Sequence, residues 1–166
     1  MNGKLTILLI AFTAALMAPA LATADPYTDV GFRGWGPRVG LSVDPDQVHF
    51  GAHFDYGHFA KRVRFQPNFE VGFSDNITLV CLNAEAAYRF SEKWDVWSPY
   101  LGGGVGLNIK NYDNGRDRDA ETDLGVNLLG GIEKGLNNGD RFFVESKLSL
   151  NDVPDVKITV GWTFYH

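Results

Sequence analysis

Eight stretches of the chain alternate apolar and polar residues, and this alternation constrains the fold more than any other feature. In the last stretch, for example, Val156, Ile158 and Val160 alternate with Lys157 and Thr159. Side chains of a β-strand point alternately to its two faces, so the pattern predicts strands with one apolar and one polar face. The eight expected strands cover residues 35–43, 48–59, 63–73, 77–90, 97–112, 122–134, 141–150 and 155–165.

Mostly short, turn-forming sequences separate these strands. Asp44-Pro45-Asp46 and Asn137-Asn138-Gly139 are typical of tight turns. Short connections require antiparallel neighbours, because parallel strands need long crossovers. Eight such strands in chain order therefore predict an all-β fold, an eight-stranded antiparallel up-and-down barrel.

The first 24 residues have the features of a targeting sequence. Lys4 precedes an apolar run over residues 5–17, and Ala22-Thr23-Ala24 is a small-x-small cleavage site. The run is shorter than the roughly 20 apolar residues that a transmembrane helix needs. We therefore expect a cleaved signal peptide over residues 1–24 and an exported barrel over residues 25–166.

Composition excludes several classes of function. The formal net charge of −5 gives no electrostatic basis for binding nucleic acid. Cys81 is the single cysteine, so no disulfide can form within the chain and a large sheet must hold the fold together. We expect no cofactor.

Alternation alone does not decide which face points inward. A soluble lipocalin-like barrel lines its cavity with the apolar face, whereas a membrane barrel turns that face toward lipid. The polar face is rich in glycine, as at Gly102, Gly104 and Gly106. Glycine weakens a water-facing sheet surface, but it leaves room for large neighbours inside a narrow barrel. This composition favours the membrane barrel.

The polar face also carries charges of both signs. Buried charges are tolerated when they are paired and hydrogen-bonded, so we expect a polar network inside the barrel. Its expected members are Arg38, His53, Asp55, Arg64, Glu70, Glu85, Arg89, Glu133, Glu145, Lys147 and Lys157.

Aromatic residues cluster at one end of the expected barrel. If the first strand begins at the periplasm, the odd strands begin and the even strands end there. Membrane barrels carry a girdle of aromatic side chains at the lipid–water interface. The expected girdle contains Trp35, Tyr88, Trp97, Trp162 and Phe164.

Residues 25–166 resemble the small eight-stranded outer-membrane barrels of the OmpX, OmpA-barrel and OmpW kind. The resemblance rests on the signal peptide, the strand count and the last eight residues. These residues, 159–166, follow the terminal pattern polar, any, Gly, any, any, apolar, any, aromatic, except that His166 replaces the final aromatic residue. The resemblance implies a monomer in the outer membrane of a Gram-negative bacterium, in contact with outer-membrane lipid and recognised by the barrel-assembly machinery.

No constellation typical of catalysis is visible. Ser146 and Ser149 have no histidine within two residues, so the His-x-Ser motif of outer-membrane deacylases is absent. His49, His53 and Asp55 share the polar face, where hydrogen bonding is favoured over a metal site. We predict no catalytic and no metal-binding residues, and a structural or envelope-interaction role. The alternatives are a soluble periplasmic or secreted lipocalin-like carrier of a small hydrophobic ligand, and an envelope lipid-modifying enzyme.

Overall fold

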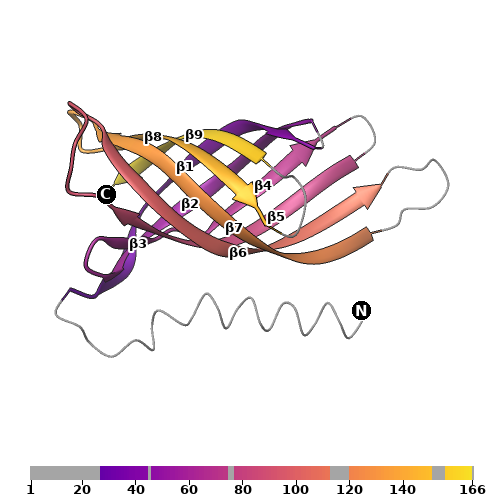
Figure 1. The fold of residues 1–166 in the computed structure, drawn as a ribbon, viewed down its shortest axis with the longest axis horizontal. Coiled ribbons are helices and arrows are strands. Elements are labelled where there is room, and N and C mark those ends of the chain that lie inside the picture. The colour runs from indigo at the N-terminus through magenta and orange to yellow at the C-terminus, as the bar shows by residue number, and fades with distance from the viewer. Residues whose placement is uncertain (1–26, 45, 75–76, 113–119, 151–155, 166) are drawn as a thin grey trace.

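The computed structural model describes residues 27–44, 46–74, 77–112, 120–150 and 156–165, all of it strands and connections (Figure 1). No helix in this described part is long and apolar enough to cross a membrane. The strands are β1 (Asp29–Val43), β2 (Gln47–Ala60), β3 (Val63–Phe65), β4 (Asn68–Phe73), β5 (Ile77–Arg89), β6 (Ser98–Tyr112), β7 (Ala120–Gly135), β8 (Arg141–Ser149) and β9 (Val156–Tyr165).

The strands close into a barrel. Each strand pairs antiparallel with its neighbours, and β1 pairs with both β2 and β9. Strands β3 and β4 both lie between β2 and β5, so together they occupy one position. The sheet is therefore a closed eight-stranded antiparallel barrel, which confirms the predicted fold class.

The third predicted strand, residues 63–73, is interrupted at Gln66 and Pro67. Proline has no N–H to donate to a neighbouring strand, so the regular ladder stops there. Two hydrogen bonds keep the segment in place, from Gln66 N to the Glu85 carbonyl at 2.8 Å and from Phe54 N to the Pro67 carbonyl at 2.9 Å. The sequence pattern alternates through this point and does not reveal the break.

Strand β1 begins at Asp29, earlier than the residue 35 expected from the sequence. The pairing between β1 and β2 is irregular between Val30 and Gly34, and Gly57 on β2 has a φ of +73°. An irregular register breaks strict alternation, which is why the sequence indicates the strand only from Trp35 onward.

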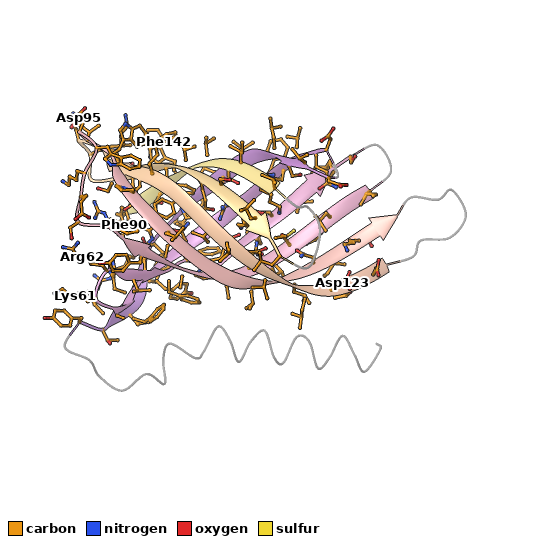
Figure 2. The ribbon with its side chains drawn as sticks, in the orientation of Figure 1. Lys61, Arg62, Phe90, Asp95, Asp123 and Phe142 are labelled. Atoms are coloured by element: carbon orange, nitrogen blue, oxygen red, sulfur yellow. The ribbon has the colours of Figure 1, made fainter. Side chains whose placement is uncertain are left out.

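We call the end of the barrel where β1 begins and β9 ends the terminal end, and the opposite end the loop end. Figure 2 shows Lys61, Arg62, Phe90 and Phe142 toward the terminal end and Asp123 toward the loop end. The three connections at the terminal end span residues 61–62, 90–97 and 136–140. Residues 113–119, between β6 and β7, lie outside the described residues, as do the expected signal peptide and His166.

Candidate functional site

Six charged side chains meet in the middle of the barrel and form what we call the central cluster, Arg38, Lys147, Lys157, Glu70, Glu85 and Glu145. All six residues are at most 5% exposed. Arg38 donates to Glu145 Oε1 over 2.7 Å and lies 3.0 Å from Glu70 Oε1. Lys157 Nζ lies 2.7 Å from Glu70 Oε2, and Lys147 forms an ion pair with Glu85. Three cations and three carboxylates balance, which is the condition under which buried charge is tolerated.

Neutral side chains complete this cluster. Tyr100 Oη donates to Glu145 Oε2 over 3.0 Å, and Asn68 Nδ2 donates to Glu85 Oε2 over 2.7 Å. These bonds and ion pairs link strands that are not neighbours in the sheet. Arg38 on β1 and Glu145 on β8, for example, form an ion pair although β9 lies between their strands. The cluster therefore spans the interior of the barrel.

A second group, the mouth cluster, lies nearer the terminal end and contains Asp55, Arg64, Arg89, Glu133 and Arg141. Arg64 Nη1 lies 2.8 Å from Glu133 Oε2, and Arg141 Nη1 lies 3.1 Å from Asp55 Oδ2. Arg89 also pairs with Glu133, at 3.1 Å, although its side chain is 46% exposed at the barrel end. An open cavity of about 470 Å³ lies against this group.

The two interior histidines do not form a site with Asp55. His49 Nε2 lies 3.0 Å from Thr159 Oγ1, and His53 Nε2 lies 2.8 Å from Thr163 Oγ1. Asp55 instead accepts a hydrogen bond from Tyr165 Oη at 2.8 Å and pairs with arginines. Among the described residues, no group of three or more His, Cys, Asp or Glu side chains could hold a metal ion.

The interior also contains an apolar cluster that the sequence analysis missed, Ala87, Tyr100, Leu129 and Phe143. The Phe143 ring is 1% exposed and lies edge-on to His53, with ring centroids 5.1 Å apart. Two guanidinium groups lie over the same ring, Arg38 at 5.8 Å and Arg141 at 6.0 Å from its centroid. Alternation along β8 could have predicted that Phe143 points inward, because it lies two residues from both Arg141 and Glu145, whose side chains point inward.

Glycines on neighbouring strands make room for these rings. A Cβ on Gly131 would stand 2.6 Å from the Tyr100 hydroxyl, and a Cβ on Gly161 would overlap the Phe143 ring. A cavity beside Glu85, Leu129 and Glu145 has a volume of only about 10 Å³, too small for more than one water molecule. The middle of the barrel is thus closely packed and polar, whereas a lipocalin-like carrier would have an apolar lining there.

The predicted girdle residues fall into two groups at the terminal end. Five rings form a continuous belt, with centroid separations of 6.0–6.4 Å between successive members. The belt runs in the order Trp97, Phe142, Trp162, Phe164 and Trp35. Tyr88 lies apart from the belt and packs edge-on against Phe90 at 5.3 Å. Phe142 joins Trp97 to Trp162 within the belt.

Several solved structures share this barrel geometry. No family model and no curated protein sequence matches the chain. Among solved structures, Neisserial surface protein A superposes with a TM-score of 0.62 at 16% identity, covering 81% of this chain and 96% of that one. The N-terminal β-barrel domain of Pseudomonas aeruginosa OprF gives 0.65 at 11% identity, with coverages of 81% and 98%.

The chain has the fold of the small outer-membrane β-barrels. A third structure with this fold, Yersinia pestis outer membrane protein Ail in a phospholipid bilayer nanodisc, gives a TM-score of 0.50 at 11% identity, covering 81% of this chain and 99% of that one. The resemblance that the sequence indicated is therefore confirmed for the fold of the described barrel.

Proposed function

We propose that the chain is a non-enzymatic, integral outer-membrane barrel of a Gram-negative bacterium with a structural or envelope-interaction role. The observation that carries the proposal is that charged side chains are buried inside the barrel while large apolar side chains are exposed on its outside. Arg38 and Glu70 are at most 2% exposed, whereas Leu41 and Ile158 are 63% and 58% exposed. In water, an apolar surface this extensive would drive association, whereas in a bilayer it is the stable arrangement.

We place the terminal end, where β1 begins and β9 ends, at the periplasm and the loop end outward. The aromatic belt at the terminal end then lies where interfacial side chains meet the headgroups. Residues 1–24 direct export and are removed. The outward face contacts outer-membrane lipid, and the last strand is recognised by the barrel-assembly machinery during insertion of the monomer.

The role of the interior is to hold the barrel rigid. The central cluster connects β1, β4, β5, β8 and β9, so it restrains the barrel from within. Eight strands leave an interior just wide enough for side chains, and wide aqueous channels need about 16 strands. Neither a wide pore nor a ligand-binding cavity in the middle of the barrel is part of this proposal.

The test is to express the full chain in a Gram-negative host and isolate the outer membrane. The proposal predicts a band in this fraction that migrates faster on SDS gels when the sample is not boiled, because the folded barrel resists the detergent. A soluble periplasmic band without a heat shift would contradict it and favour the carrier. Altered lipid A on overexpression would instead favour an enzyme.

A further inference from the structure

A cavity of about 550 Å³ opens at the terminal end, separate from the central cluster. It lies between the start of β1, the turn from β2 to β3 and the connection from β5 to β6. Its walls carry four cationic side chains, Lys61, Arg62, Arg89 and Lys93, and one carboxylate, Asp29. Figure 2 shows Lys61, Arg62 and Phe90 toward this end of the molecule.

Most of the positive charge in this cavity is not neutralised. Asp29 forms an ion pair with Arg33, and Arg89 forms one with Glu133. Lys61, Arg62 and Lys93 make no ion pair with any carboxylate of the described residues. Clustered cations of this kind attract anions, and lysine and arginine are the usual partners of phosphate groups.

Hydroxyl groups accompany the cations. Arg62 donates a hydrogen bond to Ser91, and Arg89 Nη2 donates one to Ser98 Oγ at 3.0 Å. Both serines line the cavity. Each serine hydroxyl can also donate, so the cavity offers neutral donors beside its charges, as a phosphate with several acceptor oxygens requires.

One wall of the cavity continues onto the outward face of the barrel. Phe90 lines the cavity and packs against Tyr88, which points outward and is 42% exposed. Tyr27 also lines the cavity, and the Lys61 ammonium lies 5.0 Å from the centroid of its ring. A free inorganic anion would need no apolar exit, whereas a lipid headgroup needs a path for its acyl chains.

We propose that this basic cavity binds the phosphate headgroup of an anionic phospholipid in the membrane leaflet at the terminal end. The acyl chains then run along the outward face beside Tyr88 and Phe90. This inference rests on the proposed function, because it requires the barrel to lie in a bilayer. It adds a specific lipid partner and a defined site to that function.

The test uses the processed barrel in nanodiscs that contain equal parts of phosphatidylglycerol and phosphatidylcholine. Native mass spectrometry counts the molecules of each lipid that stay bound after release. Lysines near a membrane surface attract anionic lipid, so we expect the wild type to retain phosphatidylglycerol at least about tenfold over phosphatidylcholine. The double variant Lys61→Gln/Lys93→Gln keeps only the two arginines in the cavity and should lose most of this preference, whereas Lys61→Arg/Lys93→Arg should keep it.

Lys134 supplies the matched control. It lies at the same end, with its ammonium 5.1 Å from the Trp97 ring centroid, but it does not line the cavity. Lys134→Gln removes the same charge as Lys93→Gln, yet it should leave the lipid preference unchanged. Equal losses in Lys93→Gln and Lys134→Gln would overturn the cavity assignment in favour of a general surface effect.

Two further results separate this inference from the proposed function. A wild-type barrel that is heat-modifiable in the bilayer but has no preference for phosphatidylglycerol overturns the lipid site alone. A chain that neither enters the bilayer nor shows the heat shift overturns the proposed function and the lipid site together.

Binding of inorganic phosphate as tightly as phosphatidylglycerol would show a free-anion site and overturn the lipid assignment.

Discussion

Arg38 on β1 and Glu145 on β8 are joined by a 2.7 Å ion pair across the interior, although these strands are not neighbours in the sheet. Arg38 also contacts Glu70 and lies over the Phe143 ring. One side chain thus connects the balanced charges to the apolar cluster.

Replacement of Arg38 should be strongly destabilising. Arg38→Met leaves Glu70 and Glu145 buried without their guanidinium partner, which we expect to cost about 3–5 kcal/mol. Urea unfolding of the refolded barrel in detergent or vesicles measures the change. The control is Lys93→Met at an exposed lysine, measured in detergent or in vesicles without anionic lipid and expected to change stability by no more than about 0.5 kcal/mol. Similar values for the two variants would contradict the bracing role of the central cluster.

Charge reversal distinguishes the interior from the surface. Glu85→Lys places a cation among Lys147, Arg38 and the Asn68 amide, so like charges meet in a buried space. We expect a loss of more than about 3 kcal/mol, or no heat-shifted band. Glu92→Lys makes the same charge change at an exposed residue of the connection between β5 and β6 and should alter stability by less than about 0.5 kcal/mol. Equal tolerance at both positions would rule out the interior role of Glu85.

A methyl group at Gly161 should disturb the packing of Phe143. The three nearest atoms to a Cβ built there all belong to that ring, so Gly161→Ala should cost about 1–3 kcal/mol through overpacking. Gly135→Ala is the control, because a Cβ there meets nothing within 4 Å. In the double variant Gly161→Ala/Phe143→Leu the two effects should offset each other. Strictly additive losses in a double-mutant cycle would show that the two residues are not in contact.

The aromatic belt should lie at the lipid–water interface. The chain has four tryptophans, so variants that keep only Trp35 or only Trp162, with phenylalanine at the other three positions, isolate each signal. Fluorescence quenching by lipids brominated at different depths gives the position of each indole. We expect the strongest quenching from bromines near the headgroups. Stronger quenching from bromines at the bilayer centre would refute the interfacial assignment.

Strand number and strand faces could be predicted because alternation is a local property of the sequence. On β9, Lys157 and Thr159 are buried and Ile158 and Val160 are exposed, in the phase that the pattern indicates. The break at Pro67 and the early start at Asp29 could not be predicted in the same way. The break at Pro67 leaves the alternation of apolar and polar residues unchanged on both sides. The early start at Asp29 lies where an irregular pairing between β1 and β2 interrupts this alternation.

The pairing of interior charges could not be predicted, because it depends on how the strands are staggered when the barrel closes. Nothing local connects Lys157 with Glu70, which are 87 residues apart in sequence. The inward position of Phe143 was also missed, since apolar residues were assigned to the outward face as a class. Its partner Gly161 lies directly opposite on β9, and this register emerges only from the paired strands.

The most direct test of the account asks what the apolar face touches. In a Cys81→Ala background, a nitroxide label at Val126 or Val160 should collide often with lipid-soluble oxygen and rarely with a water-soluble nickel chelate, because both residues point outward. A label at the exposed Asp46 of the loop end is the control and should show the reverse. Labels at Val126 and Val160 that behave like the one at Asp46 would contradict the account, because the apolar face would then meet water.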